Sequence, residues 1–135
     1  MDTKELKLGN LVYNHRLWVC EVTGVTSDTV TVIAGHYGVE TFTADMVHPI
    51  PLTMEIMQSL GYRMVDGGFD IGLDEPLGMY WDALTLDIVD GRGNHLIDCK
   101  YLHQLQNILD MFGLKLKGIE GLLEDIRNSY THSIL

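Results

Sequence analysis

The segment that most constrains this chain is a connector with two prolines in three positions, Pro49-Ile50-Pro51. Proline fixes φ and has no backbone N–H, so neither a sheet ladder nor a helix continues through such a segment. Thr53 then offers the hydroxyl of a helix N-cap, and Gly61 suits the left-handed residue that ends a helix. We therefore predict an extended connector, a helix near residues 53–60, and a change of architecture at this point.

The residues before the connector have the pattern of short strands separated by turns. The expected strands cover residues 8–13, 17–25, 29–33 and 39–43. Strands this short cannot close a large sandwich, but they can form a small barrel that protects their edges. We predict an SH3-like β-barrel over residues 1–48, with residues 44–47 as the short helical turn or last strand that ends it.

The residues after the connector predict an α+β lobe over residues 49–135. The expected elements are helices near 53–60, 101–112 and 119–130 and strands near 62–65, 79–82, 84–89 and 95–99. The helix at 101–112 has the clearest apolar stripe, formed by Tyr101, Leu102, Leu105, Ile108, Leu109 and Phe112. Pro76 and Gly78 are expected to interrupt the sheet, and residues 114–117 alternate as an edge strand would. The predicted fold class is mixed α+β, with an antiparallel sheet packed with helices.

Composition narrows the class of protein. No run of about 18 apolar residues is present, so no membrane span is predicted. The first residues have mixed charges and lack the apolar core of a secretory signal. Two cysteines, Cys20 and Cys99, are too few for a disulfide framework. These features predict a protein of the reducing cytoplasm.

The net charge of −10 is concentrated in one segment. Residues 66–90 contain seven acidic residues and neither Lys nor Arg. The candidate acidic patch consists of Asp66, Asp70, Asp74, Glu75 and Asp87. Such a surface repels phosphates, so direct nucleic-acid binding is not expected. The patch either solubilises the chain or imitates nucleic acid.

A resemblance adds biological context. The run Tyr101–Asn107, with the sequence YLHQLQN, follows a Pro-Ile-Pro-Leu-Thr connector and an N-terminal Gly-Asn-Leu-Val-Tyr strand. In these parts the chain resembles a family of small uncharacterised proteins from phages, prophages and mobile elements of anaerobic gut bacteria. The resemblance covers residues 6 to about 117, and the chain departs from it after Gly113. It implies a phage or prophage accessory protein acting inside a bacterial cell, and implies no chemistry.

Reactive residues form no recognised catalytic pattern. The chain lacks the nucleophile-elbow, zincin and phosphate-loop motifs. His95, Cys99 and His103 would align as zinc ligands on one helix, but the alternation at 95–99 predicts a strand that separates them. The carboxylates after residue 66 lack the EF-hand spacing. A pair of Cys20 with His36 or His48 is disfavoured because Cys20 lies in a predicted strand. We expect no enzyme, cofactor or metal site.

Two groups of residues are candidates for binding a protein partner. His103, Gln104 and Asn107 give the second helix a polar face of mostly uncharged hydrogen-bonding groups. That face either binds a partner or latches the helix to the barrel or the connector. Four aromatic residues of the predicted barrel either line a peptide groove or pack in the core and turns: Tyr13, Trp18, Tyr37 and Phe42. The apolar face of the 119–130 helix either docks on its own domain or forms a homo-oligomer.

These observations predict a non-enzymatic adaptor or accessory protein that binds another protein. An acidic decoy that occupies a host protein is the first alternative. A metal-dependent enzyme is the second.

Overall fold

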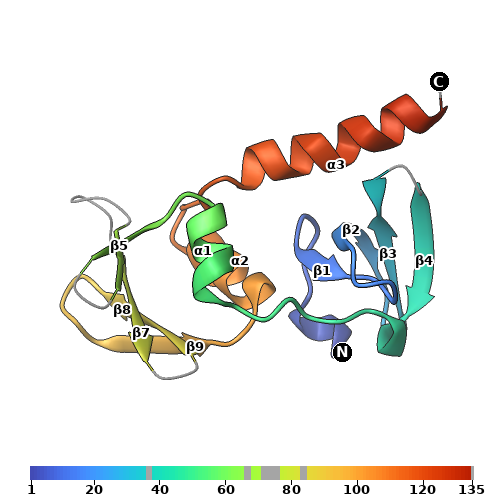
Figure 1. Ribbon diagram of the computed structural model, residues 1–135. Helices are drawn as coiled ribbons and strands as arrows, with labels where there is room; N and C mark the ends of the chain where they lie inside the picture. Colours follow the sequence, from blue (N-terminus) through green and yellow to red (C-terminus); the bar gives the residue numbers. More distant parts are fainter. Residues whose placement is uncertain (36–37, 66–67, 71–76, 83–84, 135) are drawn as a thin grey trace. The chain divides into compact units, whose positions relative to one another are not determined.

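The computed structural model describes residues 1–35, 38–65, 68–70, 77–82 and 85–134 (Figure 1). It confirms a mixed α+β fold with two antiparallel sheets. The chain forms two compact units, one of residues 1–50 with 118–135 and one of residues 51–117. In sequence, the second unit is therefore inserted between the sheet of the first unit and its last helix.

The first unit contains a four-stranded antiparallel sheet in the order β1–β2–β3–β4. Its strands are β1 (Leu11–Tyr13), β2 (Val19–Val25), β3 (Thr29–Ile33) and β4 (Val39–Thr43). β3 and β4 cover the predicted ranges, because their alternating β-branched residues suit a pleated surface. Apolar residues on one face form a core with residues from the flanking turns: Leu6, Val12, Cys20, Val22, Val30, Val32, Ala34 and Val47.

The ends of this sheet are held by short helical turns. The 3₁₀-helix η1 (Thr3–Glu5) precedes β1, and η3 (Ala44–Met46) follows β4. After η3 the chain returns to β1, where His48 and Tyr13 exchange backbone hydrogen bonds of 2.8 and 2.9 Å. Within the described residues, no pairing joins β1 to β4, so no closed barrel is found and the predicted SH3-like barrel is not confirmed.

The other face of the first sheet lies beneath the C-terminal helix, α3 (Ile119–Ile134). Glu21 of β2 is buried on this face, and Ile126 of α3 is also buried. The Arg127 guanidinium binds the Glu21 carboxylate through two hydrogen bonds, Nε to Oε1 at 2.9 Å and Nη2 to Oε2 at 2.6 Å. The sequence predicts this helix in the C-terminal lobe, but in the structure it belongs to the first unit. The ion pair and the apolar contacts of α3 account for the difference.

The second unit begins with the predicted connector and helix. Pro51 forms an isolated bridge with Tyr101, and the Leu52 N–H donates to the Lys100 carbonyl at 2.8 Å. Helix α1 (Met54–Ser59) is capped by Thr53, whose hydroxyl accepts from the N–H of Ile56. Gly61 has φ of 98°, and the next N–H returns to the last helical turn. Both the N-cap and the glycine stop are confirmed.

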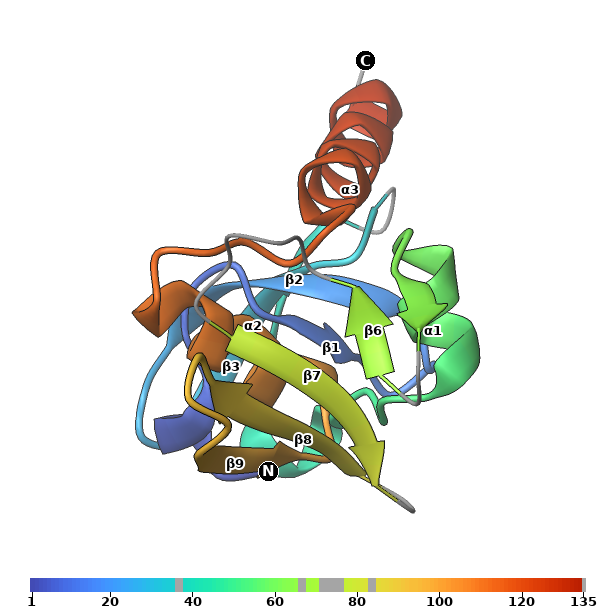
Figure 2. The ribbon, with the colours of Figure 1, turned by 90° about the vertical axis from the view of Figure 1, so that its left-hand side faces the viewer.

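A five-stranded antiparallel sheet in the order β5–β6–β7–β8–β9 forms the rest of the second unit, with α2 (Leu102–Met111). The strands are β5 (Arg63–Val65), β6 (Gly68–Asp70), β7 (Leu77–Asp82), β8 (Thr85–Asp90) and β9 (His95–Cys99). Helices α1 and α2 lie on one side of this sheet (Figure 1). The opposite side of the sheet faces the viewer in Figure 2. The buried residues of this unit include Met57, Met79, Leu86, Ile88, Cys99, Leu102, Leu105 and Leu109.

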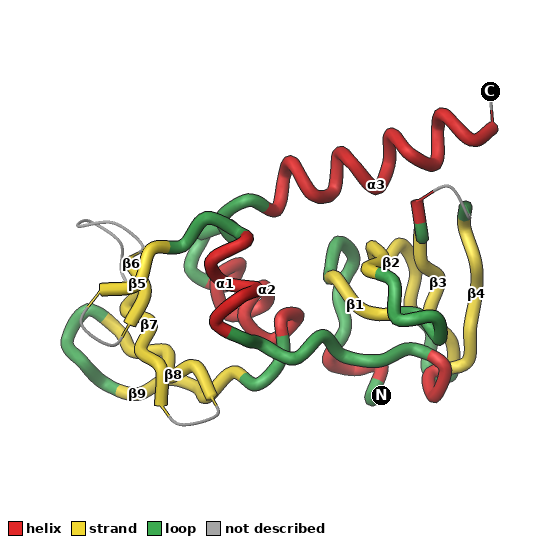
Figure 3. The backbone as a smooth tube through the Cα atoms, viewed as in Figure 1, coloured by secondary structure: helices red, strands yellow, loops and turns green. Residues whose placement is uncertain are grey.

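Two expectations about this unit were wrong. Gly78 does not break the sheet, because it lies inside β7 and pairs with Val89. Residues 114–117 form no strand (Figure 3). Instead Leu116 is buried and the Lys117 N–H donates to the Tyr62 hydroxyl at 2.8 Å, so this segment is held by tertiary contacts.

The pairing of β8 with β9 contains an irregularity that reorients one side chain. Asp87 pairs with Asp98 and Ile88 with Ile97, but Val89 pairs with His95. One residue of β9 is therefore passed over at this bulge. Bulges of this kind turn a side chain to the other face of a sheet.

Candidate functional site

The most unusual surface of the first unit is the loop that joins β1 to β2. Asn14, at the start of this loop, is fully buried. Its side-chain oxygen accepts hydrogen bonds from the N–H groups of Arg16, at 2.9 Å, and Trp18, at 3.1 Å. The Asn14 backbone also bonds to Leu17 and Trp18. One buried side chain thus fixes the path of an otherwise exposed loop.

Leu17, Trp18 and Val19 form what we term the Leu17–Val19 surface. Their exposed fractions are 66%, 37% and 36%. Leu17 has φ of 61°, and no other non-glycine residue in the described part of the chain has a positive φ. A bulky side chain rarely adopts this left-handed conformation. The Arg16 guanidinium lies 5.4 Å from the centre of the Trp18 ring, within the range of a cation–π interaction.

The other aromatic residues of the predicted groove are less accessible. Tyr13 is half-buried at the end of β1. Phe42 of β4 is also half-buried, and its ring meets the His15 ring edge-on at 5.2 Å. Tyr37 lies outside the described residues. Among the proposed barrel aromatics that lie within the described residues, Trp18 is therefore the one in an exposed position.

The polar residues proposed on α2 have different positions. His103 is 1% exposed, and its ring stacks on the Tyr101 ring with centres 6.0 Å apart. Gln104 is half-buried, and its side-chain oxygen accepts from the N–H groups of Lys100 and Tyr101 at 2.9 and 3.1 Å. Gln104 therefore caps its own helix, while Asn107 is half-buried one turn later. Gln104 thus bonds to the residues that begin its own helix and not to the barrel or the connector, and the burial of His103 removes it from any exposed binding face.

The acidic patch is only partly described. Asp66, Asp74 and Glu75 lie outside the described residues, and the side chain of Asp70 is not described. Asp90 accepts hydrogen bonds from the N–H groups of Arg92 and Asn94, which lowers the pKa of its carboxyl group. Asp90 therefore stabilises its own hairpin.

Asp87, in contrast, belongs to a cluster that the sequence does not predict. His95 Nδ1 lies 2.5 Å from Asp87 Oδ1 and 4.0 Å from Asp98 Oδ1. The hydrogen bond to Asp87 raises the pKa of His95. His95 and Asp98 are three positions apart, which predicts opposite faces of a regular strand. The bulge in β9 brings them to the same face, and no sequence signal marked it.

The sulfur atoms are poorly placed for chemistry. Cys20 is buried, its Sγ donates to the Trp18 carbonyl at 3.2 Å, and burial raises the pKa of its thiol to about 11. His48 is exposed, and His36 lies outside the described residues. Burial also raises the pKa of the Cys99 thiol, to about 12.

The three residues weighed as zinc ligands are separated. Cys99 and His103 are buried while His95 is exposed, so the three do not share a surface. The predicted strand at 95–99 is confirmed.

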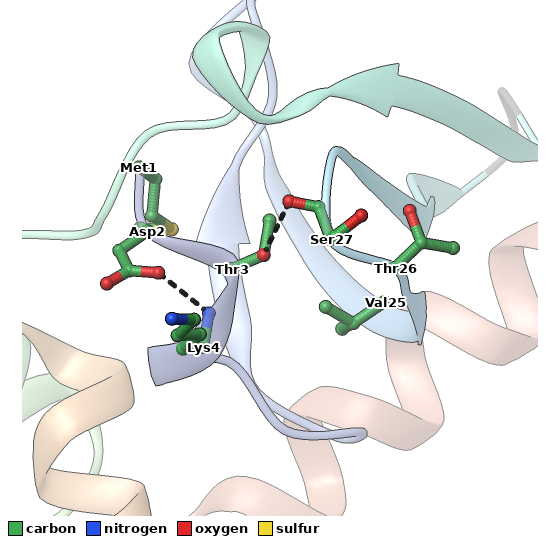
Figure 4. A pocket seen from close by; sticks show the side chains of 7 residues that line it. All are labelled: Met1, Asp2, Thr3, Lys4, Val25, Thr26 and Ser27. Carbon is green, nitrogen blue, oxygen red and sulfur yellow. Dashed lines mark hydrogen bonds between the residues drawn. The ribbon is translucent and has the colours of Figure 1, made fainter.

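A cavity of about 460 Å³ lies between η1 and the turn after β2 (Figure 4). Its lining residues are Met1, Asp2, Thr3, Lys4, Val25, Thr26 and Ser27. The Thr3 hydroxyl donates to the Ser27 carbonyl, and the Asp2 carboxylate accepts from the Lys4 N–H. The Met1 amine donates to the Ala44 carbonyl, outside the lining. The lining residues form no recognisable acid–base or nucleophilic pair.

Among the described residues, no helix combines the length and the apolar character that crossing a membrane requires. The comparisons with known proteins give no relative from which a site could be transferred. No protein-family model, no curated protein sequence and no solved structure matches this chain.

Proposed function

We propose that this chain is a non-enzymatic adaptor or accessory protein that binds another protein through the Leu17–Val19 surface. In keeping with the resemblance noted from its sequence, we place this activity in a bacterial cell that carries a phage or prophage. The observation that carries the proposal is the exposed, left-handed conformation of Leu17.

Folding alone gives no reason for this arrangement. A left-handed conformation costs an L-residue roughly 1–2 kcal/mol. An exposed leucine recovers little of that through burial, because two-thirds of the residue's surface remains in water. Glycine would fit the same backbone at lower cost. A leucine in this position is therefore best explained by a contact that it makes outside the chain.

The neighbouring residues suit a protein interface. Tryptophan and arginine are the side chains most enriched among residues that dominate binding energy. Here Arg16 stacks over Trp18, and the buried Asn14 holds the loop backbone before any partner arrives. A loop that is already ordered loses less entropy on association than a flexible one.

We also propose that the first unit is an SH3-like small barrel. Four antiparallel strands, a 3₁₀-turn at η3 and the return of His48 to β1 support this assignment. SH3-like modules bind extended, proline-rich segments in grooves lined by aromatic residues. We therefore propose that the partner presents an extended segment to Trp18.

The proposal can be tested by recovering tagged full-length protein from its native host after chemical cross-linking. Trp18→Ser and Leu17→Gly should each reduce the amount of the co-purifying partner at least tenfold. Leu8→Ser is the matched control, because Leu8 is 69% exposed and lies outside the surface. We expect Leu8→Ser to retain the partner.

Stability measurements separate binding from misfolding. Leu17→Gly should raise the free energy of unfolding by about 0.5–1 kcal/mol, since it removes the strain but adds backbone entropy to the unfolded chain. A variant that is more stable and yet loses its partner would support a binding role for Leu17. Equal recovery of the partner by all three variants would overturn the proposal.

A further inference from the structure

The outer face of the second unit's sheet brings together three metal-ligating side chains. Asp87 of β8 and His95 and Asp98 of β9 each offer one ligand atom, and these atoms all lie within 4.8 Å of one another. The side chains are 28%, 55% and 52% exposed, so an ion can reach them from solvent. This cluster lies in a different unit from the Leu17–Val19 surface, and the inference does not depend on the proposed function.

The cluster exists because of two features of strand pairing. Asp87 and Asp98 pair directly across β8 and β9, so their side chains lie on one face. The bulge between this pair and the Val89–His95 pair turns His95 to that same face. The hydrophobic partners Ile88 and Ile97 lie on the opposite face, toward the helices.

The arrangement has an electrostatic cost that a cation would relieve. Two carboxylates placed directly opposite each other in an antiparallel pair repel. His95 Nδ1 is close to one of them, at 2.5 Å from Asp87, but lies 4.0 Å from Asp98. A divalent ion between the three ligand atoms would contact both carboxylates at once. It would replace the proton shared by His95 Nδ1 and Asp87 Oδ1.

We propose that Asp87, His95 and Asp98 bind a divalent first-row transition-metal ion. One imidazole nitrogen with two carboxylate oxygens suits Zn²⁺ and its neighbours in the series. Ca²⁺ and Mg²⁺ prefer oxygen ligands only, and Ca²⁺ takes six to eight of them. Three protein ligands leave a coordination position open to water or to a group from another molecule.

The test is a calorimetric titration of chelator-treated full-length protein with ZnCl₂ and, separately, with CaCl₂. We expect one Zn²⁺ per chain at the tightest site and at least tenfold weaker binding of Ca²⁺. His95→Ala and Asp98→Asn should each weaken the tightest Zn²⁺ site at least tenfold. Co²⁺ should give visible absorption bands that shift when His95 is replaced.

Matched controls distinguish this site from the chain's other histidines and carboxylates. His48 and Asp110 are exposed and lie outside the cluster, so His48→Ala and Asp110→Asn should leave the tightest site unchanged. Circular dichroism without metal should show that all four variants keep the wild-type fold. The proposal is overturned if His95→Ala binds Zn²⁺ as tightly as wild type, or if Ca²⁺ and Zn²⁺ bind equally.

Discussion

The ion pair between Arg127 and Glu21 gives a sharp prediction about how α3 is held in the first unit. The Glu21 side chain is 6% exposed, whereas that of Arg127 is 55% exposed. Replacing Arg127 with alanine leaves a buried carboxylate without its two charge-assisted hydrogen bonds. Loss of such a partner costs about 1–3 kcal/mol. The partial exposure of the arginine places our expectation near the middle of that range, at about 2 kcal/mol.

A change at the other partner, Glu21, should lower the free energy of unfolding by less than Arg127→Ala does. Glu21→Gln keeps the shape and one acceptor, and the half-exposed guanidinium remains solvated. We expect this change to lower the free energy of unfolding by about 1 kcal/mol or less. In the Glu21→Gln background, Arg127→Ala should then lower the free energy of unfolding by under about 0.5 kcal/mol, because there is no buried charge that would lose its partner.

Urea unfolding followed by Trp18 fluorescence measures these differences in the first unit. A Trp81→Phe background removes the tryptophan of the second unit, so the signal reports one unit. Arg92→Ala is the control, since Arg92 is exposed in the β8–β9 turn. If Arg127→Ala costs the same in the Glu21→Gln background as in the protein that retains Glu21, the buried-charge argument is refuted.

Three further predictions concern the interior and the caps. Cys20 and Cys99 should react slowly with a disulfide reagent at pH 7.5 and fully in urea, because raised pKa values of about 11 and 12 leave under about one thiol in a thousand ionised. Gln104→Ala should lower the stability of the second unit by about 1–2 kcal/mol in chemical denaturation, because it loses two capping bonds, while Gln104→Glu should preserve it. Leu105→Asp should unfold the second unit, seen as lost far-ultraviolet circular dichroism, because Leu105 is fully buried and the change introduces an unpaired charge.

Features decided by local chemistry were the ones the sequence predicted well. Thr53 and Gly61 delimit α1 because a hydroxyl cap and a left-handed glycine act within a few residues. The apolar stripe of α2 and the alternation of β3 also follow from periodicity alone, and both elements lie where predicted. These signals need no knowledge of distant parts of the chain.

Features decided by distant or irregular contacts were missed. The placement of α3 depends on an ion pair between residues 106 positions apart, and nothing near Arg127 indicates Glu21 as its partner. The His95 cluster depends on a bulge that shifts the register of β9 by one residue. The sequence does not predict the left-handed conformation of Leu17 either, because glycine or asparagine normally occupies such positions.

The insertion of one unit within the other has a consequence for the order of folding. The β-sheet of the first unit is synthesised before the inserted unit, but α3 is synthesised after it. Until α3 arrives, Glu21 is a charged residue on an uncovered sheet face. α3 can dock only after the chain between the first unit's sheet and α3 has closed into a loop that contains the whole second unit. Closing so long a loop slows the docking of α3, as high contact order slows folding in general. We therefore expect refolding to show an early phase in the inserted unit and a slower phase in which α3 docks.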